Sequence, residues 1–524
     1  MLVDARKLPS GSRLTAAICV IGAGAAGITL AREFAGTAAD IIVLESGGTA
    51  YDSATQALAR GKNVGYEYFD LEGERIRQLG GCTGHWGGEC RPLDPEDFSV
   101  RDWVPHSGWP FGRTELEPYY RRATKVVEIG EYDRFQADWD EITGAHEAFQ
   151  AIRFTTGDIN PRQFQNSPPT RMGTRYGPEL DAAKNIRVLL NANLVGFETG
   201  DDGKTVTAAK VGCLGGPSLT VTARAFVLAA GTIENARLLL VASGPDGKGF
   251  GNEHGMVGRF FQEHIAHREL AHMVPASKPQ ITAYKEAMQQ GSVAAAFTEA
   301  AQRERQLPNF LIFFDAYLTG SEPPPIRSFK ALVGGVREQT VPDRFWAHVG
   351  NVMSDLPGVT RYAFRRLSTP DETVGYFEIG FVAEQVPNPD SRVRLGSERD
   401  AFGLPLVELD WQLTDLDRVF MLRALDHTVR EIGASGLGRV KIVIPENGDG
   451  WLDRISASHH PMGTTRMHSD PRHGVVDANC RVHGMTNLYV ASASVFPCSG
   501  AGSPTYTVVT LAIRLADHLK QQIA

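Results

Sequence analysis

The sequence of 524 residues lacks several features that would have assigned it to a class at once. It contains no uninterrupted run of 18 apolar residues, which excludes a membrane-spanning helix from the expected structure. Its first residues, MLVDARKLPSGSRL, have neither the apolar segment nor the twin arginine of an export signal. Basic residues are in the minority, 53 against 61 acidic ones, and the formal net charge of -8 argues against a nucleic-acid partner.

Cysteine is scarce and scattered. The six cysteines show no closely spaced pairs, so we expect reduced, mostly buried thiols in a cytoplasmic protein. Two of them, Cys82 and Cys90, flank the unusual stretch GGCTGHWGGEC, but they have no second ligand pair. The sequence therefore predicts neither a disulfide nor a metal site there. A Cys-x-x-Cys-His haem motif is also absent, so any cytochrome partner would be a separate chain.

What the sequence does contain is a nucleotide-binding unit near its start. The run AAICVI at 16–21 predicts a buried strand, GAGAAG follows directly, and IIVLE at 41–45 predicts a second strand. Three glycines in a G-x-G-x-x-G pattern between strand and helix let the backbone turn sharply and present N–H groups to a pyrophosphate, and an acid at the end of the second strand suits an adenosine ribose. The candidate residues are Gly22, Gly24, Ala25, Ala26, Gly27, Glu45 and Ser46.

The rest of the chain predicts an α/β fold with two domains. Strand-like segments at 186–199 and 205–214, joined by an Asp-Asp-Gly turn, and a strand–turn–helix pattern at 223–243 extend the first sheet. The return of the chain to the first sheet at 223–243, far from the nucleotide-binding unit in the sequence, favours FAD over NAD. Alternating strands such as 374–385 indicate a second, antiparallel sheet. We expect a Rossmann-like FAD-binding domain with a parallel central sheet at 1–140, 181–262 and 441–524, and an antiparallel-sheet substrate domain at 141–180 and 263–440.

Several motifs, in order along nearly the whole chain, resemble those of the glucose-methanol-choline (GMC) oxidoreductases. They are GAGAAG with Glu45, AAGTIENARLLL, VGRFFQEH (257–264), AEQVPNPDSRVRL (383–395), SASHHPMGTTRM (456–467) and the C-terminal SGAGSPTYTVVTLA (499–512). The resemblance implies an enzyme that oxidises alcohols by hydride transfer to N5 of FAD while a base removes the hydroxyl proton.

The resemblance also implies which residues do the chemistry. The histidine of the H-P-x-G-T pattern falls on His460, whose neutral imidazole suits a general base. His459 beside it is expected to play a supporting part. The second catalytic position of the family, usually His or Asn, falls on Ser503, a departure that would leave proton removal to His460 alone unless the alignment is shifted and another residue does this work. Pro504 would begin a helix whose N-terminus faces the flavin.

The remaining cofactor contacts follow from the same resemblance. The loop at 80–90 would pass along the dimethylbenzene edge of the flavin, where Gly80, Gly81 and Gly84 allow close approach. His85 is a candidate for a covalent bond to the 8α-methyl group. Beyond the nucleotide unit, the expected FAD contacts are Gly81, Thr83, His85, Trp86, Gly87, Gly88, Val195, Ala230, Gly231, Ala493, Ser503 and Thr505.

Within the family, His85-Trp86 after a glycine-rich turn is most similar to pyranose oxidases and bacterial sugar oxidoreductases. This implies a sugar or glycoside as substrate, oxidised at a ring hydroxyl at C2 or C3. The aromatic run at 309–317 is more consistent with a core strand than with a sugar-stacking surface. Alternatives are an enzyme for a primary alcohol, an aminoglycoside or an aromatic alcohol, a non-redox FAD-containing lyase, and an inactive partner subunit. The sequence leaves the electron acceptor (oxygen, a quinone or another acceptor) and a homo-oligomeric state open.

Overall fold

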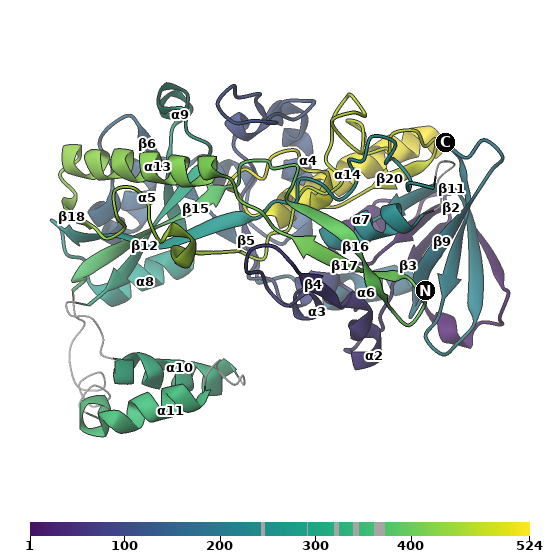
Figure 1. The fold of residues 1–524 in the computed structure, drawn as a ribbon, viewed down its shortest axis with the longest axis horizontal. Coiled ribbons are helices and arrows are strands. Elements are labelled where there is room, and N and C mark those ends of the chain that lie inside the picture. The colour runs from purple at the N-terminus through teal and green to yellow at the C-terminus, as the bar shows by residue number, and fades with distance from the viewer. Residues whose placement is uncertain (243–246, 291, 319–323, 339–344, 361–372, 524) are drawn as a thin grey trace.

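The computed structural model describes residues 1–242, 247–290, 292–318, 324–338, 345–360 and 373–523. Two large β-sheets occupy opposite ends of the longest axis of the molecule (Figure 1). One sheet is mainly parallel and the other antiparallel, with helices packed on both, which confirms the expected α/β fold class.

The mainly parallel sheet contains the nucleotide-binding unit. Its order is β1-β8-β3-β2-β11-β10-β9, and β20 also pairs with β11. The pairings from β1 to β11, and that of β11 with β20, are parallel, whereas β11, β10 and β9 form an antiparallel meander. Its strands are β1 (Leu2–Asp4), β2 (Arg13–Ile21), β3 (Ile41–Leu44), β8 (Ile186–Leu190), β9 (Asn193–Thr199), β10 (Val206–Gly212), β11 (Ser218–Leu228) and β20 (Leu488–Val490). Residues 18–21, 41–44 and 225–228 of its central strands are apolar and buried, as is typical of strands that are covered on both faces.

The antiparallel sheet has the order β18-β12-β15-β14-β13-β6, and β19 pairs with β12. All of its pairings are antiparallel. Its strands are β6 (Ile159–Gln163), β12 (His264–Pro275), β13 (Val293–Phe297), β14 (Phe310–Tyr317), β15 (Tyr376–Glu384), β18 (Gly438–Ile442) and β19 (Ile455–Ser456). Strand β12 is the link to the site described below, because it begins at His264.

Helices and smaller strands complete the fold. A three-stranded sheet joins β16 (Arg392–Arg399) and β17 (Pro405–Asp410) to β4 (Gly61–Asn63), and β5 (Glu89–Cys90) pairs with β7 (Gln165–Asn166). The helices are α1 (Ala25–Arg32), α2 (Ser53–Gln56), α3 (Leu71–Glu74), α4 (Glu117–Val126), α5 (Trp139–Ala145), α6 (Met172–Ala182), α7 (Thr232–Val241), α8 (Ile281–Gln290), α9 (Glu299–Arg305), α10 (Pro324–Glu338), α11 (Phe345–Ser354), α13 (Asp415–Ala434) and α14 (Pro504–Ile523). Figure 1 shows α10 and α11 as a hairpin that stands apart from the main body. Among the helices of the described ranges, none combines the length and the apolar character needed to cross a membrane.

Most expected elements are present, with one clear difference. The segment 186–199 forms two strands rather than one, because Asn191 adopts a left-handed backbone conformation with φ of 57° and turns the chain between β8 and β9. The hairpin between β9 and β10 forms as predicted. In the aromatic run, Phe310 and Phe314 are buried in the core of β14. That strand therefore packs the core and does not line the cavity described below.

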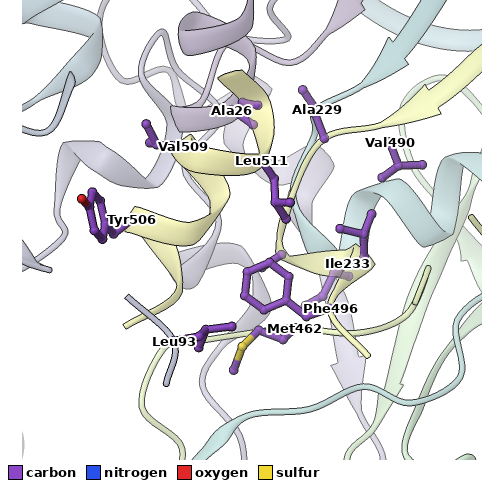
Figure 2. Close-up of a cluster of buried hydrophobic side chains, with 14 of the residues drawn as sticks. Ala26, Leu93, Ala229, Ile233, Met462, Val490, Phe496, Tyr506, Val509 and Leu511 are labelled. Atoms are coloured by element: carbon purple, nitrogen blue, oxygen red, sulfur yellow. The ribbon is translucent and has the colours of Figure 1, made fainter. Parts of the chain in front are cut away.

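A buried apolar cluster joins the two ends of the chain beneath the nucleotide unit. Figure 2 shows side chains from α1, α7, β20, α14 and the loop after residue 460 meeting in one place. Met462 and Phe496 at its centre have no exposed surface. Met462 lies two residues after His460, so this packing anchors the chain on one side of the predicted base.

Candidate active site

A cavity of about 300 Å³ lies between the glycine turn, the loop after β8, the start of α7 and the C-terminal segment. The first residues of three helices line it: Ala25 of α1, Thr232 of α7 and Pro504 of α14. Each helix start has backbone N–H groups without a partner inside the helix and carries a partial positive charge. Their convergence makes the cavity suitable for an elongated ligand that carries negative charge.

The three glycines of the turn have three different roles. Gly22 has φ of 106°, and a Cβ there would lie 2.5 Å from the carbonyl oxygen of Ala229 on the neighbouring strand. A Cβ on Gly27 would lie only 1.9 Å from the carbonyl oxygen of Gly22, so helix α1 can pack against the turn only with glycine here. A Cβ on Gly24 would meet nothing within 4 Å, and this residue lines the cavity. Gly24 therefore leaves space for a ligand, whereas Gly22 and Gly27 allow the chain itself to pack.

Glu45 ends the second strand at the cavity wall. Its carboxylate accepts hydrogen bonds from the backbone N–H of Ala23 at 2.9 Å and of Gly47 at 2.8 Å. Burial raises the pKa of Glu45, and these two hydrogen bonds oppose that shift. The acid thus ties the glycine turn to the next loop while remaining at the surface of the cavity.

The glycine-rich loop at 80–90 approaches the turn from the other side. A Cβ on Gly81 would lie 3.1 Å from Cα of Gly24, and a Cβ on Gly80 would lie 2.6 Å from the backbone nitrogen of Gly173. The glycines of this loop, which lack side chains, are needed partly because the loop packs against other backbone, and not solely because it faces a ligand. Gly81, Cys82 and His85 line the cavity.

A pair of histidines forms the chemical centre of the cavity. The Nδ1 atoms of His264 and His460 lie 2.9 Å apart, although 196 residues separate them in the sequence. His264 is fully buried, and His460 faces the cavity. The Nε2 atom of His264 lies 3.3 Å from the carbonyl oxygen of Ser499. The sequence motif VGRFFQEH contains His264, but nothing in the sequence indicated that it contacts His460.

These contacts determine which nitrogen of His460 carries a hydrogen. A carbonyl oxygen can only accept, so the Nε2–H of His264 donates to Ser499. Burial lowers the pKa of His264 to about 4, so its ring is neutral and its Nδ1 accepts a hydrogen bond. The Nδ1–H of His460 donates that bond, which leaves the Nε2 lone pair of His460 free. Burial, then the neighbouring His264 and His459, hold the pKa of His460 well below its usual range, so the free nitrogen remains a base.

Most of the residues expected from the sequence lie at the cavity, and a minority do not. Those that line it are Gly22, Gly24, Ala25, Ala26, Glu45, Ser46, Gly81, His85, Ala230, Gly231, His460, Ala493 and Thr505. Those that do not are Gly27, Thr83, Trp86, Gly87, Gly88, Val195 and Ser503. Strand β9 presents Asn193 and Leu194 to the cavity in place of Val195, which lines a separate surface depression near Phe402. Trp86 instead donates its indole N–H to the carbonyl oxygen of Thr170.

His459 differs from His460 in its surroundings. Its backbone is left-handed, with φ of 58°, and its ring stacks on Phe69 with centroids 3.4 Å apart. Its side chain is 60% exposed, and its Nδ1 lies 3.9 Å from a carboxylate oxygen of Glu74. Burial lowers the pKa of His459. The positive φ at this position turns the two adjacent histidines toward different partners.

Apart from Cys82, the cysteines do not line the cavity, and neither does the group of possible metal ligands. All six cysteines are free thiols, and five of them are buried. Asp158, His427 and Glu431 bring possible ligand atoms within 4.8 Å of one another between α13 and the start of β6, but none of the three lines the cavity.

The glycine turn, the cavity and the architecture together fit a dinucleotide-dependent oxidoreductase. Comparison with known proteins agrees: the profile of the GMC oxidoreductase family matches residues 387–512. Paromamine 6'-oxidase of Streptomyces fradiae is 27% identical, covering 95% of this chain and 90% of its own length. C-glycoside 3-oxidase of Microbacterium trichothecenolyticum is 32% identical over 27% of each chain. The crystal structure of pyridoxine 4-oxidase from Mesorbium loti covers 96% of this chain and 99% of its own, with a TM-score of 0.60 and 19% identity.

Residues 387–512 therefore match the GMC oxidoreductase family, and the protein is an oxidoreductase that acts on CH–OH groups. The cofactor implied by the family is FAD, and the residues present fit it. Three helix N-termini face the cavity, Gly24 leaves its wall open, and an acid closes the second strand where a ribose would bind.

Proposed function

We propose that the protein oxidises a carbohydrate alcohol, with His460 removing the hydroxyl proton. The observation that carries the proposal is the 2.9 Å contact between His264 and His460 at the cavity wall, because it leaves His460 with a free Nε2 lone pair. Bound FAD supplies the acceptor for the two electrons of the C–H bond. The neutral imidazole accepts the proton, and its low pKa favours release of that proton before the next turnover.

The first candidate substrate is a sugar or glycoside oxidised at a ring hydroxyl, C2 or C3. It is supported by the His85-Trp86 loop at the cavity and by the similarity to a C-glycoside 3-oxidase. The second candidate is a primary alcohol of an aminoglycoside, supported by the similarity to paromamine 6'-oxidase over nearly the whole chain. The two candidates share the base and differ in the carbon that is oxidised.

A substrate panel distinguishes these candidates. Purified holoenzyme is mixed without oxygen with free sugars, C- and O-glycosides and paromamine-type aminoglycosides, and loss of the visible flavin absorption is followed. We expect bleaching by at least one of these classes, with the product assigned by NMR as a ring ketone or a C6 aldehyde. Bleaching by simple aliphatic or aromatic alcohols alone would overturn the carbohydrate assignment. Repeating the reaction with oxygen or an artificial acceptor then identifies an oxidase or a dehydrogenase.

A covalent bond between His85 and FAD is a separate proposal. His85 lines the cavity, and burial lowers the pKa of its imidazole, so the ring is a neutral nucleophile at physiological pH. Acid precipitation tests it, because covalent flavin stays with the protein pellet. We expect His85→Ala to move the yellow colour into the supernatant, and colour already in the supernatant with the unaltered protein would refute the bond.

A further inference from the structure

A set of buried acids lies next to the segment that carries His460. The carboxyl of Glu263 accepts hydrogen bonds from the backbone N–H groups of His264 at 3.1 Å, Ser458 at 3.1 Å and His460 at 2.7 Å. The hydroxyl of Tyr68 lies 2.9 Å from the same carboxyl. Glu263 therefore holds the backbone of both histidines of the pair and fixes the segment that carries His460.

The Tyr68 hydroxyl faces a second carboxyl as well. It lies 2.7 Å from Oε1 of Glu74, the last residue of α3, and both side chains are buried. A phenol has one hydrogen to donate, and burial together with the two carboxyls raises the pKa of Tyr68 well above its usual value. One hydroxyl cannot donate to two carboxylates at once. One of the two acids must therefore carry a proton and donate it to the Tyr68 oxygen.

The surroundings decide which acid is protonated. Glu263 receives three backbone N–H donors, which stabilise its charged form, whereas Oε2 of Glu74 is buried without any hydrogen-bond partner in the described part of the chain. Burial raises the pKa of both carboxyls, to about 7 for Glu74 and about 8 for Glu263, so the pair retains a proton around neutral pH. We place this proton on Glu74 because the donors favour charge on Glu263.

We propose that Glu74 is a neutral carboxylic acid that positions the catalytic segment through Tyr68 and Glu263, and that its ionisation sets the upper pH limit of the enzyme. Loss of the proton would bring two carboxylates to one phenol and take the Tyr68 hydrogen bond from one of them. If Glu263 loses the hydrogen bond from Tyr68, its carboxyl holds the backbone of residues 458–460 less firmly. The other ionisable groups near Glu74 are its neighbour Arg75, the Cys82 thiol and the His459 ring at 3.9 Å. The effect on activity rests on the proposed function of His460, whereas the protonation state does not.

Infrared spectroscopy of the holoenzyme tests the protonation state without a substrate. We expect the difference spectrum between the unaltered protein and Glu74→Gln near pH 6 to contain the C=O band of a buried protonated carboxyl, shifted in D₂O. Glu72→Gln is the matched control, because Glu72 lies on the same helix but pairs with Arg60. We expect no such band in the Glu72→Gln difference spectrum. A Glu74→Gln difference spectrum that shows only loss of a carboxylate band would overturn the proposal.

A pH profile tests the positioning role. Gln can donate a hydrogen bond to Tyr68 as the neutral acid does, so we expect Glu74→Gln to keep activity within about twofold near pH 6. One pH unit above the pKa, we expect the activity of the unaltered enzyme to fall about tenfold below its maximum and that of Glu74→Gln to change little, because one ionisation lowers the active fraction about tenfold per unit beyond its pKa. Tyr68→Phe should lose activity at all pH values. An unchanged alkaline limb in Glu74→Gln would refute the positioning role. If no compound of the substrate panel is oxidised but the infrared band is present, only the proposed function is refuted.

Discussion

The glycine turn at 22–27 and the His264–His460 pair lie at the same cavity, but they are built in opposite ways. The turn is one continuous hexapeptide, and two of its glycines, Gly22 and Gly27, are required by backbone atoms at the end of an adjacent strand or only a few residues away. The pair joins the start of β12 to a loop 196 residues later, and a third segment, at Ser499, fixes its hydrogen positions. The turn proposed to bind the cofactor is therefore local, whereas the proposed catalytic pair depends on how the two sheets are joined.

The largest expected effect comes from removing the proposed base. We expect His460→Ala to reduce the rate of flavin reduction by substrate about 1,000-fold, within the range that general-base catalysis contributes. The protein should still bind FAD, because the glycine turn is untouched. The measurement is stopped-flow absorbance without oxygen. His459→Ala is the control: its side chain is 60% exposed and points to other partners, so a loss equal to that of His460→Ala would contradict the assignment.

The local half is tested by two alanine substitutions. Gly27→Ala would place a Cβ 1.9 Å from a backbone oxygen, so we expect a loss of unfolding free energy of about 3 kcal/mol or more together with loss of FAD. Gly24→Ala meets no protein atom within 4 Å, so stability without FAD should change by less than about 0.5 kcal/mol while FAD affinity falls. Denaturant unfolding and FAD titration measure both quantities. Equal destabilisation by the two substitutions would remove the distinction between packing and ligand-facing glycines.

This contrast explains how far the sequence could predict the site. The turn, Glu45 and the strands around them follow from short patterns of β-branched residues and glycine, and the structure has them where the patterns indicate. His460 was identified through a motif, but its partner was not, because no local pattern shows that residue 264 lies against residue 460. The family resemblance places a second catalytic position at Ser503, and this residue does not line the cavity. Val195 was expected to contact the cofactor, but the residues of its strand that line the cavity are Asn193 and Leu194. The two-domain division stays a prediction.

A smaller effect is expected from changing the partner of the base. His264→Leu removes the acceptor for the Nδ1–H of His460, so its ring can change tautomer and rotate. We expect kcat to fall between about 10- and 100-fold, because a ring that is free to change tautomer still adopts the active form part of the time. His264→Asn can place an amide oxygen near the position of Nδ1 and should restore most of the rate. Equal losses in the two variants would indicate that His264 serves packing alone.

The smallest effect concerns acid pH, where we expect the histidine pair and the glycine turn to respond differently. The pKa of His264 is lowered to about 4 and that of His460 is also depressed, so the unfolded chain binds protons below about pH 6.5 that the folded chain does not. Stability should therefore decline as pH falls from about 6.5 toward 4, and His264→Asn should lessen this decline because it removes one of the two groups. FAD binding by the glycine turn should change little between pH 7 and 5.5, since no histidine belongs to that turn. Thermal unfolding and FAD titration at matched pH values measure the two quantities; a parallel decline in both would show that the histidine pair and the turn are energetically coupled across the cavity.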